Sequence, residues 1–176
     1  VDLDIMAVGD VAKMLNVQPS QAIADLLPAL KQTRLPEQLS LKPFIATHAS
    51  GVDVMVALPG PRQVNQLDPE ALPKLFQALR HHYAYVVIDG GKVFSESLIA
   101  AFDAANLILL VTGPDVITLF QTKWALDLLE SLLFPSSMVK AILNRAESRG
   151  GVDTRDARVA IACEVIGEIP SDGRVV

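Results

Sequence analysis

Short runs of apolar residues alternate along the chain with longer segments in which apolar residues recur at helical spacing. The runs predict buried strands at Val1–Ile5, Val52–Leu58, Tyr85–Ile88, Leu107–Val111, Val139–Leu143 and Val165–Ile169. The other segments predict helices over Asp10–Leu15, Ser20–Lys31, Asp68–His82, Ser95–Ala104, Asp115–Phe134 and Asp153–Cys163. This order predicts a doubly wound α/β fold, in which helices flank a mostly parallel sheet.

Several of the predicted helices begin with a recognisable signal. Asp68 is followed by Pro69, and Ser20 precedes another apolar helical segment, so both polar residues are predicted N-caps. The long helix opened by Pro114 and Asp115 carries more apolar residues than one buried face needs, among them Phe120, Trp124, Leu128 and Leu132. Two interpretations stay open for them: burial against neighbouring helices, or a partner or dimer surface.

Composition and charge narrow the class of protein. Hydrophobic residues make up 51% of the 176 residues, which is enough for one sizeable core. The net charge of −5 and the pI near 5.1 argue against a general nucleic-acid-binding surface. The single cysteine, Cys163, excludes an internal disulfide and favours a cytoplasmic location, and no apolar stretch is long enough to span a membrane.

The chain opens at Val1 directly in a predicted strand, with no preceding cap or turn. We therefore expect residues 1–176 to form a single nucleotide-binding-type α/β domain that is truncated at its N-terminus and also at its C-terminus.

Polar residues gather where the predicted strands end, which is the edge at which parallel sheets bind ligands. They are Asp2 and Asp4, Asp89, Thr112–Asp115, Asn144 and Arg145, and Pro170–Asp172. A carboxylate that follows four apolar residues, as Asp89 does, suits the ordering of water around Mg²⁺, although aspartate is also an ordinary turn former. Asp2 and Asp4 lie two residues apart and would point the same way on a strand, which favours either a cation between them or a solvent-facing strand end.

Taken in order, these segments resemble the MinD/ParA superfamily of deviant-Walker ATPases, and within it the pilus-assembly and polar-localisation branch typified by CpaE and TadZ. The resemblance spans nearly all of the chain. It rests on Val1–Asp4 with Gly9–Asn16, Tyr83–Asp89, Ala101–Ala105 with Leu109–Asp115, Leu143–Arg145, and Ile169–Asp172. It implies a P-loop NTPase-like fold with ATP and Mg²⁺ as cofactors.

The resemblance also implies a role for each residue of the site. Asp2 and Asp89 would be associated with Mg²⁺, and Asp4 would position the attacking water. The segment from Gly90 to Glu96 would sense the γ-phosphate. Asn144 would hydrogen-bond adenine, with Arg145 and the loop from Pro170 to Asp172 beside the base; a side-chain amide suits this task because it can both donate and accept.

The sequence departs from the family pattern in two ways. The glycine-rich, lysine-bearing phosphate loop of the family is not found in these 176 residues, and Gly90, Gly91 and Lys92 follow Asp89 where the family usually has a proline. We therefore expect the chain as given not to hydrolyse ATP.

The intact parent would bind Mg-ATP between two subunits of a homodimer, with a pilus-assembly or secretion protein as a further partner and a peripheral or polar position in the cell. The alternatives are a non-catalytic scaffold of the same fold and a partitioning ATPase that binds DNA, against which the acidic pI weighs.

Overall fold

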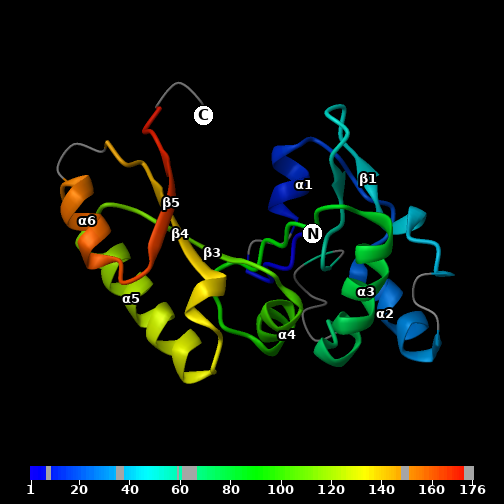
Figure 1. Cartoon of the computed structure of the whole chain (residues 1–176). Coiled ribbons are helices and arrows are strands. Elements are labelled where there is room, and N and C mark those ends of the chain that lie inside the picture. Colours follow the sequence, from blue (N-terminus) through cyan, green and yellow to red (C-terminus); the bar gives the residue numbers. More distant parts are fainter. Residues whose placement is uncertain (7–8, 35–37, 59, 61–66, 148–150, 173–176) are drawn as a thin grey trace. The chain divides into compact units, whose positions relative to one another are not determined.

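The computed structural model describes residues 1–6, 9–34, 38–58, 60, 67–147 and 151–172 (Figure 1). They form two compact units, Val1–Ala104 and Ala105–Val176. The prediction of one domain over residues 1–176 stays a prediction.

The first unit contains helices packed around short extended segments, which pair antiparallel in β1–β2 and parallel at the isolated bridges of Asp2. In chain order its elements are α1 (Asp10–Met14), α2 (Ile23–Gln32), η2 (Lys42–Phe44), β1 (Ala46–Thr47), β2 (Asp53–Val54), η4 (Pro69–Ala71), α3 (Leu72–His82) and α4 (Glu96–Ala104). The predicted cap at Asp68 is confirmed, since its carboxylate accepts the N–H of Glu70. The predicted cap at Ser20 is wrong: α2 begins at Ile23, and the Ser20 hydroxyl donates instead to Pro43 O.

The core of the first unit lies between α2 and α3. Each helix buries one apolar stripe, and the extended segments add Leu3, Met55 and Leu58 to the same cluster. The stripes consist of Ile23, Leu26, Leu27 and Leu30 on α2, and of Leu72, Leu75, Phe76 and Leu79 on α3. Helical spacing of these positions explains why the sequence pattern located both helices.

Three of the predicted strands occur only as short stretches of pairing in this unit. Residue Asp2 forms isolated parallel bridges with Val56 on one side and with Asp89 on the other. Its N–H donates to Met55 O at 2.9 Å, and Leu3 N donates to Asp89 O at 2.8 Å. The predicted strand over Val52–Leu58 contributes β2, which pairs antiparallel with β1, and the single parallel bridge of Val56 to Asp2.

Hydrogen bonds among the side chains of Thr47, Asp53 and Tyr83 stabilise the β1–β2 hairpin. Asp53 accepts hydrogen bonds from the Thr47 hydroxyl at 2.5 Å and from the Tyr83 hydroxyl at 2.6 Å. Burial, followed by the bond to Asp53, raises the pKa of Tyr83 to about 12. The same two hydroxyl donors hold the pKa of Asp53 below its ordinary value.

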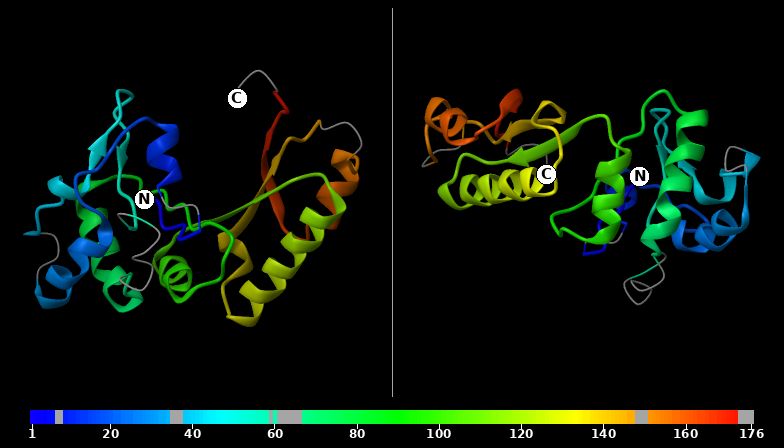
Figure 2. Two further views of the ribbon diagram at one scale, coloured as in Figure 1. Left: turned by 180° about the vertical axis from the view of Figure 1, so that it is seen from behind. Right: turned by 60° about the horizontal axis from the view of Figure 1, so that its bottom comes forward.

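The second unit is a parallel sheet with helices against one face (Figure 2). Its elements are β3 (Ile108–Thr112), α5 (Val116–Ser131), η5 (Ser136–Met138), β4 (Val139–Asn144), α6 (Thr154–Ala160) and β5 (Glu164–Ile169), and the strand order is β3-β4-β5. Leu119 of α5 and Ala157 of α6 share one buried cluster with Ala141 and Leu143 of β4. The predicted parallel sheet flanked by helices is therefore confirmed.

The opposite face of β3 is open. Leu109 and Val111 are exposed, whereas Ile108 and Thr112, which alternate with them, are buried. No helix within the described part of the chain is both long and apolar enough to cross a membrane.

Candidate functional site

The carboxylates predicted to hold a metal meet in the first unit. Asp2 and Asp89 are bridge partners on adjacent parallel segments, so their Cα atoms are about 4.8 Å apart and their side chains leave the same face. Asp2 is only 1% exposed, whereas Asp89 is exposed to solvent. One buried and one open carboxylate thus lie side by side.

Asp2 is held by backbone donors. Its Oδ1 accepts the N–H of Asp4 at 3.2 Å, and its Oδ2 accepts the N–H of Val11, in the first turn of α1, at 3.4 Å. Burial raises the pKa of Asp2, these two N–H donors oppose the rise, and the charge of Asp89 adds to it. A cation between the two carboxylates would relieve both the burial of charge and the repulsion.

Asp4 lies against the turn that follows Asp89. Its Oδ1 accepts the N–H of Met6 at 2.8 Å, and a Cβ placed on Gly91 would be 2.7 Å from the same oxygen. Gly91 also has φ of +64°, and its N–H donates to Asp89 Oδ1 at 3.1 Å. Glycine is required here for both its backbone conformation and its close approach to a carboxylate.

The carboxylate oxygens of Asp2 and Asp89 are suitable ligands for Mg²⁺. Carboxylate oxygens are its usual protein ligands, and the ion commonly takes one or two of them and completes its shell with water and phosphate oxygens. Within the described ranges, no three His, Cys, Asp or Glu side chains form a ready-made metal cluster.

The residues predicted to recognise adenine lie in the second unit, at the carboxyl ends of the strands. Asn144 is the last residue of β4 and pairs with Ile169, which ends β5 directly before Pro170 and Asp172. Asn144 Oδ1 accepts the N–H of Arg145 at 2.9 Å, so, as far as the described residues are concerned, the amide NH₂ and a second oxygen lone pair are available to a ligand. Arg145 itself has φ of +53°, as expected of a tight turn after a strand.

The loop after β3 is tied to the same edge. Asp115 caps α5 by accepting the N–H and the hydroxyl of Thr118, at 2.9 and 2.6 Å, and these bonds, aided by the charge of Arg145, lower the pKa of Asp115. Val152 N donates to Pro114 O at 2.6 Å, which fixes the segment after β4 onto the loop after β3.

Sequence reasoning missed some of the supporting groups. The Thr112 and Thr122 hydroxyls, both buried, are hydrogen-bonded to each other at 2.7 Å beneath this edge. The N–H of Val11 on the Asp2 carboxylate was also missed. Thr112 had been identified from the sequence as a polar residue at a strand end, but its bond to Thr122 and the contact of Val11 with Asp2 join positions whose proximity only the fold reveals.

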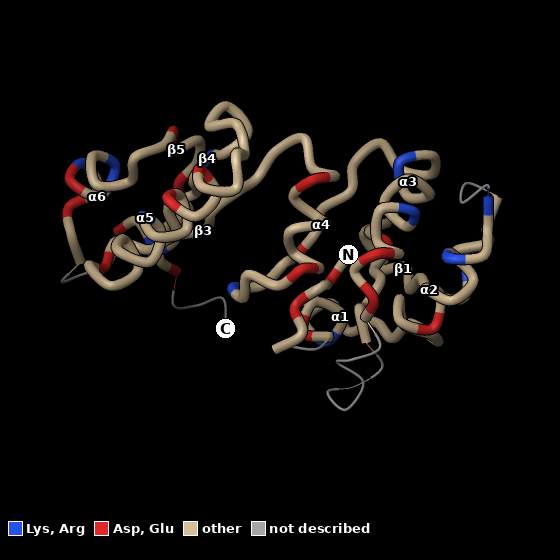
Figure 3. The backbone as a smooth tube through the Cα atoms, turned by 90° about the horizontal axis from the view of Figure 1, so that it is seen from below, with Lys and Arg blue, Asp and Glu red and all other residues tan. Residues whose placement is uncertain are grey.

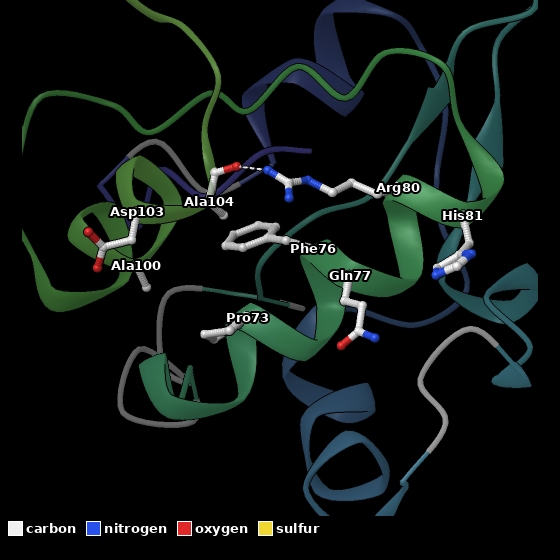
Figure 4. A pocket seen from close by; sticks show the side chains of 8 residues that line it. All are labelled: Pro73, Phe76, Gln77, Arg80, His81, Ala100, Asp103 and Ala104. Atoms are coloured by element: carbon white, nitrogen blue, oxygen red, sulfur yellow. Dashed lines mark hydrogen bonds between the residues drawn. The ribbon is translucent and has the colours of Figure 1, made fainter. Parts of the chain in front are cut away.

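A separate hollow of about 370 Å³ lies between α3 and α4 (Figure 4). Its lining includes Phe76, Gln77 and His81 from α3 and Asp103 from α4, and Arg80 donates to the carbonyl of Ala104 across it. It contains none of the residues predicted for the metal or the base.

Comparison with known proteins identifies the architecture. No protein-family model and no curated protein sequence matches the chain. A ParA family ATPase from Chlorobium tepidum matches it with a TM-score of 0.79 and 20% identity, over 89% of this chain and 64% of that one. The chain has the fold of the ParA and MinD ATPases. The predicted fold class, doubly wound and P-loop NTPase-like, is thereby confirmed.

Two MinD structures agree with this result. The cell division ATPase MinD from Pyrococcus furiosus matches with a TM-score of 0.74 and 20% identity, over 97% of this chain and 69% of that one. A MinC:MinD cell division protein complex from Aquifex aeolicus matches with a TM-score of 0.67 and 19% identity, over 94% and 66%. The chain thus spans about two thirds of the length of these proteins.

Proposed function

We propose that the chain is part of a MinD/ParA-like ATPase of the CpaE/TadZ branch, which binds Mg-ATP at a dimer interface and acts in pilus assembly or polar localisation. The observation that carries the proposal is the pairing of a buried carboxylate, Asp2, with an exposed one, Asp89, on adjacent parallel segments. The fold shared with ParA and MinD ATPases supports it independently.

The carboxylates of the first unit have distinct tasks in this proposal. Asp89, which is open to solvent, would hold Mg²⁺, and the buried Asp2 would supply the second negative charge. Asp4, fixed by Met6 N and by the turn at Gly91, orients the attacking water. Mg²⁺, when bound, neutralises charge on the phosphate oxygens, and catalysis is otherwise mainly positioning.

The second unit supplies recognition of the base. The Asn144 amide donates to and accepts from adenine, while Arg145 and the loop from Pro170 to Asp172 flank it. The alignment of the carboxyl ends of β4 and β5 supports this assignment, because it places Asn144 next to Ile169 and thus beside that loop.

The biological setting rests on resemblance. The motifs of the CpaE/TadZ branch support a role in pilus assembly or polar positioning, with a secretion or pilus-assembly protein as partner. The MinC:MinD complex is a precedent for a partner protein on this fold. DNA is the less favoured ligand, because the net charge is −5 and Lys and Arg are scattered among acidic residues in the described part of the chain (Figure 3).

A non-catalytic scaffold of the same fold is the second candidate. The observation that favours it is the tight turn after Asp89, in which Gly91 lies directly on the Asp4 carboxylate. A switch built this way departs from the proline-containing pattern of the family, which fits a protein that uses the fold for docking and not for hydrolysis.

Calorimetric titration of Mg-ATP into the full-length protein tests the proposal. The wild type should bind, and the affinity of Asp89→Ala should be at least about tenfold lower. Asp103→Ala is the matched control, because Asp103 is an exposed aspartate on α4, and it should bind as the wild type does. Absence of binding by the wild type would favour the scaffold. Equal binding by wild type and Asp89→Ala would contradict the assigned metal site.

A further inference from the structure

The hollow between α3 and α4 has an apolar floor that is part of the core of the first unit. Phe76, which lines the hollow, is only 3% exposed and packs in that core, and Pro73 and Ala100 line the hollow beside it. The volume of about 370 Å³ lies near the lower end of the range for small-molecule sites, about 300–1,000 Å³. The hollow is therefore large enough for a ligand the size of a single aromatic acid.

Arg80 brings hydrogen-bond donors to the hollow. One of its five N–H groups donates to the carbonyl oxygen of Ala104, the last residue of α4, which fixes the position of the guanidinium (Figure 4). No other acceptor within the described part of the chain bonds to this guanidinium, so the other four N–H groups are available to a ligand. Gln77 and His81, one helical turn apart on α3, also line the hollow.

The charges around the hollow favour an anionic ligand. Among the described residues of the lining, Arg80 is the only lysine or arginine and Asp103 is the only acid. The Asp103 carboxylate points away from the Phe76 ring, and the carbonyl oxygen of Ala104 already accepts from Arg80 (Figure 4). Helix α3 has no acidic residue. A planar guanidinium matches the two oxygens of a carboxylate, and one permanent cation matches a monoanion better than a phosphate group, whose charge approaches two.

We propose that the hollow between α3 and α4 is a binding site for a free monocarboxylate with a small aromatic or branched aliphatic body. The carboxylate accepts two N–H groups of Arg80, and the Gln77 amide is a further donor. The apolar body lies against Phe76 and Pro73. The hollow shares no residue with the metal site or with the residues assigned to adenine. The proposal therefore goes beyond the proposed function and does not depend on it, and its test uses no nucleotide.

Three probes that differ only in their polar group test the proposal: 3-phenylpropionate, 3-phenylpropanol and 3-phenylpropylamine. Their dissociation constants for the full-length protein are measured from two-dimensional amide NMR spectra at neutral pH. The acid should bind with a Kd of about 1 mM or lower, as expected of so small a ligand, and at least about tenfold more tightly than the alcohol or the amine. The signals of residues 73–81 and 100–104 should shift first. Equal affinities, a preference for the amine, or shifts confined to other residues would overturn the proposal.

Arg80→Met separates the carboxylate contact from the fold. Methionine keeps a long apolar side chain but has no N–H, so the affinity for the acid should fall about tenfold, to that of the alcohol. The ratio of the two affinities is measured on one protein, so a modest loss of stability from the missing bond to Ala104 does not imitate this result. Arg155→Met, at an exposed arginine of α6, is the matched control and should leave the ratio unchanged. A preference for the acid that survives Arg80→Met would show that the carboxylate binds elsewhere.

Arg80→Lys provides a second test that preserves the charge. Lysine can still donate to the carbonyl of Ala104, but it lacks the planar pair of N–H groups, so the affinity for the acid should fall about fivefold while that for the alcohol stays the same. Circular dichroism and urea unfolding check that both Arg80 variants are folded. Equal affinity of the wild type and Arg80→Lys for the acid would contradict the two-point contact.

Filling the hollow tests its location. Ala100 is half-buried in the lining, and Ala100→Leu should abolish binding of both the acid and the alcohol. Inorganic phosphate at about 10 mM should not displace the acid from the wild type, because the site matches a monoanion with an apolar body. Unchanged binding by Ala100→Leu would place the probe outside the hollow. Binding of N-acetyl-alanyl-phenylalanine about tenfold more tightly than of 3-phenylpropionate would show that the site takes a peptide C-terminus, and would contradict a free monocarboxylate as its ligand.

Discussion

Asp89→Asn should stabilise the protein, although it removes a residue of the proposed metal site. The Asp2 and Asp89 carboxylates are about 5 Å apart if their separation follows that of adjacent strands. At that distance the repulsion of two unit charges is between ~0.8 and ~3 kcal/mol for relative permittivities of about 80 and about 20. Asp89 is exposed, so the lower end applies, and we expect a gain of about 1 kcal/mol at neutral pH without Mg²⁺.

The substitution is conservative in other respects, because an asparagine oxygen can still accept the N–H of Gly91. Urea unfolding of the wild type, Asp89→Asn, Asp2→Asn and the double variant gives the coupling between the two positions. In the Asp2→Asn background the gain from Asp89→Asn should vanish, since no second charge remains. An equal effect of Asp89→Asn in both backgrounds would refute the idea that these carboxylates face each other.

The dependence on pH gives the same test a second form. The folded-state pKa of Asp2 is raised above its ordinary value of 3.8. Between these two pKa values the folded protein therefore keeps a proton on Asp2 that the unfolded chain has lost. Wild-type stability attributable to this group is therefore present below 3.8 and falls as pH rises through the folded-state pKa. Asp2→Asn should lack this fall, and an identical pH profile for the two proteins would contradict the burial of the charge.

Further predictions concern other positions. Gly91→Ala should lower the free energy of unfolding by about 2 kcal/mol or more, and Gly51→Ala by about 1 kcal/mol. Both glycines have positive φ, but only Gly91 lies against a carboxylate. Equal losses in urea unfolding would contradict the close contact of Gly91 with Asp4. Absorbance titration should show the Tyr83 phenol ionising near pH 12, and the free energy of unfolding should fall as pH rises from about 10 to about 12; the absence of a transition near pH 12 would contradict the hydrogen bond between Tyr83 and Asp53. Asn144→Ala should weaken ATP binding to the full-length protein about tenfold and reduce its preference over GTP, and an unchanged preference in competition titrations would refute base recognition.

The helices and the second sheet were predictable because their signals are local. Asp68 and Asp115 cap helices at the positions predicted from the sequence. The strands β3 and β4 coincide with apolar runs of about the predicted length. Helical periodicity and capping depend on neighbours within one or two turns, and that information is present in a single sequence.

The strands of the first unit were less predictable, because their extent depends on contacts between distant segments. After Leu3, hydrogen bonds to side chains replace the backbone hydrogen bonds between strands. The Asp2 carboxylate accepts the N–H of Asp4, and the Asp4 carboxylate accepts the N–H of Met6, so the chain turns and the strand ends. Tyr85 belongs to a run that predicts a buried strand, yet it is 90% exposed. The run of apolar residues is the same whether or not a neighbouring segment covers it, so the sequence alone does not distinguish the two cases.

In the candidate site, too, the features with a local sequence signal were predictable and those that depend on distant contacts were not. The aspartates were identifiable as polar residues ending apolar runs, and the structure brings Asp2 and Asp89 together. The burial of Asp2 under α1 and the hydrogen bond between Thr112 and Thr122 depend on tertiary packing, so the sequence pattern did not reveal them.

The most direct test of the metal site is nuclear magnetic resonance of the full-length protein with Mn²⁺-ATP in place of Mg²⁺-ATP. Paramagnetic relaxation falls off steeply with distance, so the amide signals that broaden first mark the residues nearest the ion. Broadening should begin at residues 2–4 and 89–91, and Asp89→Ala should abolish it. Broadening that begins elsewhere, with these amides unaffected, would contradict the assignment of Asp2 and Asp89 as the metal site.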